Sequence, residues 1–164
     1  RILRRMSISM ETSLKHMAWA NQKVFTAVRA LPDEALSSFI TNPEWTAGEI
    51  LRHICNGASW YVFTLGLGEN TRPARISKSS EISGLASLLA DRDALLNRHV
   101  SSIERDVTIH YETGPETFKA STILAQAVHH ATEHRAQLID ALEYKGFSPI
   151  NLDDIDLWAW EKIK

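Results

Sequence analysis

Residues 121–144, STILAQAVHHATEHRAQLIDALEY, are the segment that best predicts the fold class. Its apolar residues recur at steps of three and four, which is the spacing of one face of an α-helix. Gly146 follows where a C-terminal glycine is common, and Pro149 prevents the helix from continuing. The segment therefore predicts a long amphipathic helix that ends near Tyr144.

Three earlier segments have the same periodicity, at about residues 9–31, 46–65 and 80–103. The second of them opens with Thr46 and Glu49, which match a capping box. The connections between the segments are of mixed length. Four long helical patterns joined in this way predict an all-α protein, a four-helix bundle.

Two shorter patterns lie outside these helices. Residues 107–111 alternate apolar with polar side chains, a turn is predicted over residues 113–116, and residues 117–119 could return as a partner strand. A two-stranded hairpin is only marginally stable alone, so we expect it to pack on the helices just before the fourth one. Residues 151–163 predict a short docked C-terminal helix.

Length and composition favour one globular domain. The chain has 164 residues, of which 44% are hydrophobic and 23% charged, with a net charge of −2. These values exclude an intrinsically disordered chain, and they give no basic face for binding nucleic acid. We expect a single domain over residues 9–164, preceded by an N-terminal extension over residues 1–8.

The sequence also predicts where the protein resides. The basic residues 1–6 are not followed by an apolar run, so we expect no secretory signal. The longest uncharged stretch, residues 53–68, is 16 residues long and too short and polar to cross a membrane. A single cysteine, Cys55, cannot form an internal disulfide, which favours a reducing, cytoplasmic location.

His130 and His134 form the first candidate site. They are four residues apart, so on a helix they lie one turn apart on nearly the same face, and they could bind one metal ion. That face also carries apolar residues: Ile123, Ala127, Leu138 and Ala141. Buried imidazoles need polar partners, and hydrogen bonds to a neighbouring helix would serve as well as a metal. His129 points about 100° away and is predicted to lie on the surface.

His53 could complete the site. It lies on the apolar stripe of the second predicted helix, among Ile50, Ile54 and Gly57. Helix bundles build metal sites from side chains on facing helices, and three imidazoles would leave a coordination position open. We therefore expect the second and fourth helices to face each other. The alternative for His53 is a core histidine with one hydrogen bond.

Other candidate residues give weaker signals. Glu133 directly precedes His134, so the pattern of a zinc protease with its general base is missing. Cys55 faces away from His53 on the same helix. Trp19 and Trp60 could line a pocket between the first two helices. Three aspartates form an acidic cluster in the C-terminal segment: Asp153, Asp154 and Asp156. Negative charge at the start of a helix is their more usual role.

Three motifs together resemble a known family. They are Trp19-Ala20-Asn21, WTAGEILRHI at residues 45–54, and His130-x-x-x-His134-Arg135-x-Gln137. The sequence is similar over about residues 9–160 to the DinB-like family, bacterial four-helix bundles related to bacillithiol transferases and mycothiol-dependent maleylpyruvate isomerases. The resemblance implies that His53, His130 and His134 are metal ligands. Ala136 departs from the family, which often has glycine there, but alanine should preserve the helix.

The resemblance also implies a function. It suggests a transferase or isomerase that uses a divalent metal ion (zinc, nickel or iron) and a low-molecular-weight thiol to act on a small-molecule substrate. Alternatives are a metal-dependent hydrolase, a non-enzymatic metal-binding stress or accessory protein, and an interaction module with core histidines. The resemblance and the C-terminal tryptophans suggest a homodimer. Arg135 and Gln137 could orient ligands or brace the bundle, and no catalytic residue is predicted.

Overall fold

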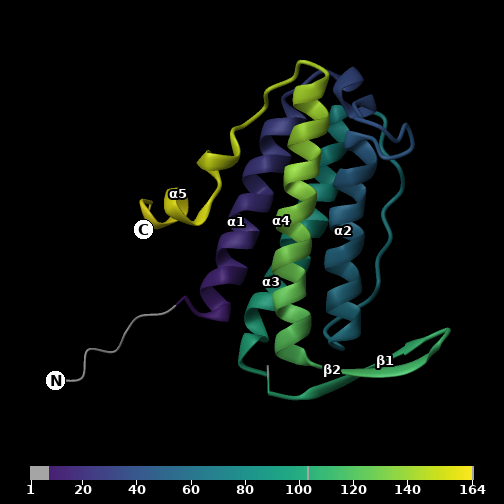
Figure 1. The fold of residues 1–164 in the computed structure, drawn as a ribbon, viewed down its shortest axis with the longest axis vertical. Coiled ribbons are helices and arrows are strands. Elements are labelled where there is room, and N and C mark those ends of the chain that lie inside the picture. The colour runs from purple at the N-terminus through teal and green to yellow at the C-terminus, as the bar shows by residue number, and fades with distance from the viewer. Residues whose placement is uncertain (1–7, 103, 164) are drawn as a thin grey trace.

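Four long helices form the body of the protein. The computed structural model describes residues 8–102 and 104–163, so the predicted N-terminal extension lies outside the described residues except for its last residue. The helices are α1 (Met10–Arg29), α2 (Ala47–Thr64), α3 (Ile82–Arg98) and α4 (Ala120–Tyr144), as Figure 1 shows. The predicted four-helix bundle is confirmed.

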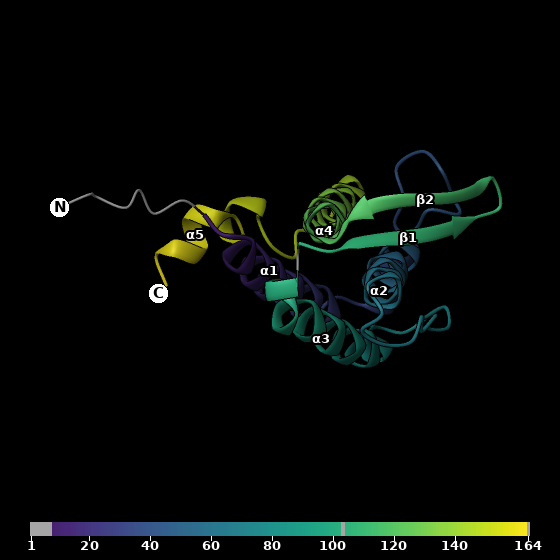
Figure 2. The ribbon, with the colours of Figure 1, turned by 90° about the horizontal axis from the view of Figure 1, so that it is seen from below.

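The first two helices lie diagonally across the bundle. Both α1 and α2 pack against α3 and against α4 (Figure 2). The prediction that the second and fourth helices face each other is therefore confirmed. The prediction that Trp19 and Trp60 line one pocket between these helices is wrong. Trp19 and Trp60 pack against different clusters of the core.

The core consists of two apolar clusters stacked along the bundle axis. One includes Phe25 and Leu138, and the other includes Leu14 and Leu124. Polar side chains of α1, α3 and α4 lie between the two clusters: Asn21, Asp93 and Arg135. We call these three residues the polar layer. The bundle therefore has polar groups buried at mid-height, at the level where the functional candidates are found.

Side-chain caps mark the starts of two of the four long helices. The hydroxyl of Ser9 accepts a hydrogen bond from the Thr12 backbone N–H at the start of α1, and Thr46 does the same for Glu49 at the start of α2. The predicted capping box is half wrong, because the Glu49 carboxylate instead forms an ion pair with Arg52. Local charge pairing has replaced the second capping bond.

The third helix is shorter than predicted. It begins after the short 3-10 helix η2 (Ser79–Glu81) and ends at Arg98, and the chain continues as η3 (Val100–Ser102). The ring of His99 hydrogen-bonds to the Leu95 carbonyl at this end. The predicted end at residue 103 lies outside the described residues. A further 3-10 helix, η1 (Asp33–Ser37), lies between α1 and α2.

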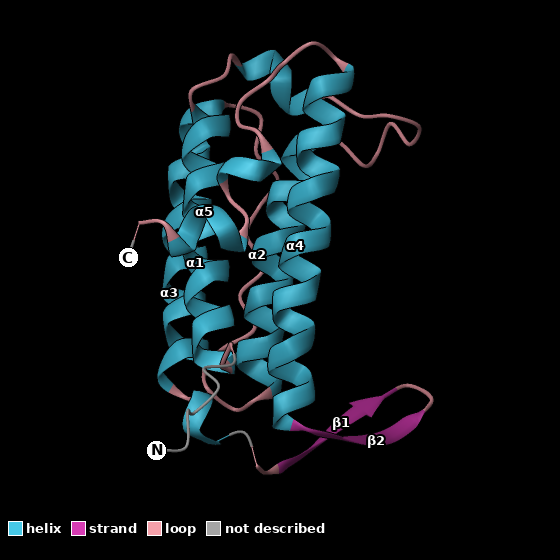
Figure 3. Ribbon diagram, turned by 60° about the vertical axis from the view of Figure 1, so that its left-hand side comes forward, coloured by secondary structure: helices cyan, strands magenta, loops and turns pink. Residues whose placement is uncertain are grey.

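The predicted hairpin is present, with a different turn. Strands β1 (Asp106–Tyr111) and β2 (Gly114–Lys119) pair antiparallel, so the turn lies at residues 112–113 rather than 113–116 (Figure 3). Pro115 is part of β2, opposite His110. A proline is acceptable there because both strands of a two-stranded sheet are edge strands.

The C-terminal segment contains the predicted short helix, and a short 3-10 helix precedes it. The 3-10 helix is η4 (Leu152–Asp154), capped by the Asn151 side chain, and the α-helix is α5 (Leu157–Glu161), capped by the Asp156 side chain. Buried Ile155 between them accepts a hydrogen bond at 2.8 Å from the His16 ring. The segment is thereby held against α1. No helix in the described part of the chain is long and apolar enough to cross a membrane.

Candidate metal centre

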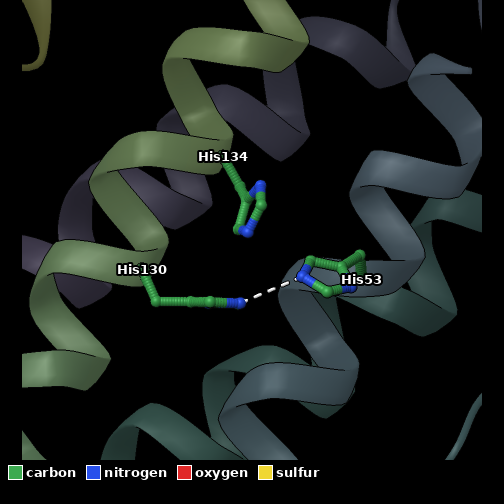
Figure 4. A group of neighbouring side chains, drawn as sticks. All are labelled: His53, His130 and His134. Carbon is green, nitrogen blue, oxygen red and sulfur yellow. Dashed lines mark hydrogen bonds between the residues drawn. The ribbon is translucent and has the colours of Figure 1, made fainter. Parts of the chain in front are cut away.

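Three histidines meet between α2 and α4. His53 comes from α2, and His130 and His134 come from successive turns of α4 (Figure 4). One ring nitrogen from each lies within 4.8 Å of the other two, and the Nε2 atoms of His53 and His130 are 3.1 Å apart. Within residues 8–102 and 104–163, these are the only three histidine, cysteine or acidic side chains with such geometry.

The donor set fits a divalent metal ion. Two nitrogens on tetrahedral bonds of about 2.0–2.1 Å would be roughly 3.3 Å apart, close to the 3.1 Å between His53 and His130. Imidazole binds metal in its neutral form. Burial, and then the proximity of His134 and His53, lowers the pKa of His130 to about 4. Burial also lowers the pKa of His53. Both rings are therefore neutral and able to coordinate at pH 7.

Gln137 fixes which nitrogen of His134 is free. The indole Nε1 of Trp45, which can only donate, lies 3.2 Å from Gln137 Oε1 and identifies that atom as an acceptor. His134 Nδ1 lies 2.9 Å from the same oxygen and must donate as well. The lone pair of His134 is therefore on Nε2. A partner on the second nitrogen is a general feature of histidine ligands, and Gln137 gives His134 such a partner.

Trp45 forms one wall of the centre. Its ring contacts His53 and His134 edge-on, with centroids 5.0 and 5.7 Å apart. The residue directly precedes Thr46, the cap of α2, so the start of that helix positions the indole. In the sequence, Trp45 is recognisable only as part of a motif. No periodicity in a loop could have shown where its ring points.

Gly57 makes room for His130. A Cβ atom at this position would lie 2.3 Å from His130 Cε1 and 2.8 Å from its Nδ1, far closer than real contacts. The ring of His130 therefore rests directly on the backbone of α2. Glycine within a helix costs about 0.5–1 kcal/mol relative to alanine. The sequence signal was a glycine one turn after His53 on the same face, interpreted only as part of the apolar stripe.

Arg135 braces the bundle and does not hydrogen-bond to any of the three histidines. Its guanidinium, 3% exposed, donates from Nη1 to Asn21 Oδ1 at 2.6 Å and from Nη2 to Thr132 Oγ1 at 3.1 Å. Asn21 Nδ2 in turn donates to Asp93 Oδ2 at 2.9 Å. Asn21 thus connects a cation on α4 to a carboxyl group on α3. Of the two roles expected for this pair, Arg135 therefore has the bracing one, whereas Gln137 holds the ring of His134.

Burial shifts both ends of this network. It raises the pKa of Asp93 to about 7, against the opposing effects of Asn21 and Arg135. It lowers the pKa of Arg135 to about 10, against the opposing effect of Asp93. Asp93 was not predicted from the sequence to have a role. Its signal was a carboxyl group on an otherwise apolar stripe with Leu85, Leu89 and Leu96.

The other candidates have structural roles or are exposed. Cys55 is buried and donates to the Leu85 carbonyl at 3.4 Å, and burial raises the pKa of its thiol, so it is not a nucleophile. His129 is exposed, as predicted. Asp156 caps α5, the usual role of an acidic residue at a helix start.

Comparisons with known proteins agree with this fold. A model of the DinB family matches residues 6–163. A search of the curated proteins gives no match. The crystal structure of a DinB-like protein from Bacillus cereus ATCC 10987 is similar, with a TM-score of 0.69 and 20% sequence identity, over 89% of this chain and 99% of that one. At that identity the likeness shows the fold alone.

Proposed function

The chain belongs to the DinB family, and from this premise we propose that His53, His130 and His134 bind one divalent metal ion. The observation that carries the proposal is the convergence of three ring nitrogens within 4.8 Å of one another, on two facing helices. The lowered pKa values of His53 and His130 support it, because they keep both rings neutral. Imidazole ligands suit zinc, nickel or iron.

We further propose that the protein is a transferase or isomerase that uses a low-molecular-weight thiol. A divalent ion held by three neutral ligands would supply positive charge that lowers the pKa of a thiol beside it. Gln137 holds His134 with its free nitrogen toward the centre, and Gly57 lets His130 reach it. In a transfer, a sulfur–carbon bond forms, the bond from that carbon to its leaving group breaks, and the leaving group takes the thiol proton.

Location and assembly are part of the same proposal. We propose a cytoplasmic protein, since a low-molecular-weight thiol stays reduced there and the single cysteine is consistent with that compartment. We also propose a homodimer. Trp158 on α5 is 75% exposed and could contact a second copy. Sedimentation that finds only a monomer of 18.5 kDa at every concentration would contradict the dimer.

Metal content tests the site. Protein purified without a histidine tag should carry about one ion per chain, measured by mass spectrometry of the metal. His130→Ala should lose that ion, while His129→Ala, which removes the exposed neighbouring histidine, should keep it. Full metal content in His130→Ala would make the ligand assignment wrong.

A conjugation assay tests the activity. The metal-loaded protein would be mixed with several bacterial thiols and a generic electrophile such as 1-chloro-2,4-dinitrobenzene. We expect conjugation with at least one thiol in the parent protein and in His129→Ala, and none in His130→Ala. Metal binding without conjugation of any thiol would favour an accessory protein, and hydrolysis of ester substrates would favour a hydrolase.

A further inference from the structure

An apolar pocket of about 190 Å³ lies between the hairpin and the paired helices α2 and α4. Six of its lining residues come from four elements: Trp60 and Tyr61 of α2, Ile109 and Tyr111 of β1, Phe118 of β2, and Gln126 of α4. We call it the aromatic pocket. The hairpin extends from the base of α4 past α2 (Figures 1 and 2). Its residues Ile109, Tyr111 and Phe118 form one side of the pocket.

The hairpin wall is anchored to the bundle. Ile109 and Phe118 pack against the core cluster that contains Tyr61. The Arg105 side chain, just before β1, donates a hydrogen bond to the Leu65 carbonyl at the end of α2. The backbone N–H of Ala120 donates to the Arg105 carbonyl at 2.9 Å. The pocket is therefore formed by the chain itself before any ligand binds.

The chemistry of the lining selects a class of ligand. Four of the lining residues are aromatic, and none carries a charge. Aromatic side chains prefer offset-stacked and edge-to-face partners, which flat apolar groups provide. A cavity of about 150 Å³ is enough to take up benzene. The aromatic pocket thus fits one uncharged aromatic ring, or an apolar group of similar size.

Tyr61 joins the pocket to the candidate metal centre. Its ring contacts Trp60 edge-on, with centroids 5.2 Å apart, and contacts the His130 ring edge-on at 5.7 Å. One ring therefore separates the pocket from a proposed metal ligand. A substrate with its apolar part in the pocket would have its other end close to the three histidines.

We propose that the aromatic pocket binds the ring-bearing part of the electrophilic substrate and so determines substrate specificity. This inference rests on the proposed function, since it places the reacting carbon toward the histidines. It goes beyond that function by naming the substrate class: a small electrophile that carries one uncharged aromatic or similar apolar group.

Binding can be tested without activity. Metal-free protein with labelled isoleucine methyl groups would be titrated with benzyl alcohol and followed by NMR. Two of the lining residues are isoleucines, Ile109 and Ile123, and ring currents should shift their methyl signals in a saturable way. Tyr111→Ala, which removes a wall side chain that is 40% exposed, should weaken binding roughly 3- to 10-fold. Tyr144→Ala, at the far end of α4 and 64% exposed, is the matched control.

A kinetic comparison tests the specificity. With active protein, Tyr111→Ala should raise KM for 4-nitrobenzyl chloride more than KM for iodoacetamide, which carries no ring. The pocket proposal is overturned if benzyl alcohol shifts no methyl signal of Ile109 or Ile123, or if both tyrosine variants bind it equally. If these shifts occur but no thiol is conjugated, the proposed function fails and the pocket stands as a binding site.

Discussion

Two adjacent residues of α4 serve two different regions of the molecule. His134 reaches toward α2 and the other two histidines. Arg135 belongs to the polar layer and donates to Asn21 of α1, which in turn donates to a carboxyl group of α3. Arg135 is buried and donates to two side chains. The histidine cluster is only partly buried, and its ring nitrogens face one another. Buried polar groups in which every donor meets an acceptor stabilise a fold. Acceptor nitrogens that point at one another are instead suited to binding a ligand.

Replacing Arg135 by methionine should have the largest effect. Removing one member of a buried charged network typically costs about 3–5 kcal/mol, because its partners are left buried and unpaired. Arg135→Met should therefore lower the free energy of unfolding by about that much in urea titrations. His134→Ala, one residue earlier and partly buried, should cost about 1 kcal/mol in metal-free protein. Equal costs would mean that the two regions do not differ as described.

Gly57→Ala should affect the other region selectively. The added Cβ would displace the His130 ring, so metal affinity should fall about 10- to 100-fold, the size seen when a ligand loses its support. Alanine favours the helix, so the free energy of unfolding of the metal-free protein should change by less than about 1 kcal/mol. Gly84→Ala is the control, because a Cβ on that α3 residue meets nothing within 4 Å. Calorimetric metal titration would measure the difference, and unchanged affinity in Gly57→Ala would show that His130 is not a ligand in this position.

Gln137→Ala should have a smaller effect on the same site. The variant removes the acceptor that orients His134 Nδ1 and also binds the Trp45 indole. We expect metal affinity about tenfold weaker, with the stoichiometry of one ion kept. Gln137→Glu retains the acceptor and should restore most of the affinity. If both variants bind like the parent, the hydrogen bond does not position the ligand.

The two regions should also respond to pH in opposite directions. His130 has its pKa lowered from 6.5 to about 4, so the unfolded chain takes up its proton first and stability is lost as pH falls between these values. Asp93 has its pKa raised from 3.8 to about 7, so stability is lost as pH rises through that window. The two slopes oppose each other, and the metal-free parent protein should show the smallest net change.

Single variants would separate the two slopes. Relative to the parent, Asp93→Asn should gain stability as pH rises from about 4 to 7, and His130→Ala should gain it as pH falls from about 6.5 to 4. Urea unfolding of metal-free protein at a series of pH values measures both. If Asp93→Asn instead lost stability relative to the parent as pH rises, or His130→Ala as pH falls, the directions assigned to the two pKa shifts would be wrong.

The helices and the histidine set could be predicted because both depend on local spacing. A repeat of three and four residues shows which face of a helix is buried, and it placed His53, His130 and His134 on such faces. It does not show which helix covers that face. The diagonal placement of α1 and α2 was therefore missed, and a pocket was wrongly predicted between Trp19 and Trp60.

Residues that act through a neighbour were the hardest to predict. Gly57 matters because of a ring on α4, and Asp93 because of an amide on α1. Neither role is visible in the helix that carries the residue. The turn was predicted too late in the chain for a similar reason. Pro115 can lie in a strand because β2 has a free edge, and the sequence does not show that edge.

The polar layer also restricts how the helices can slide along one another. Apolar side chains are largely interchangeable, so a stripe of leucines would tolerate a shift by one turn, about 5.4 Å. Asn21 and Arg135 have specific partners at one height only, as buried polar groups that specify alignment in other helical assemblies do. Because α4 carries both Arg135 and two of the histidines, the layer that aligns this helix also sets the height at which the imidazoles meet His53.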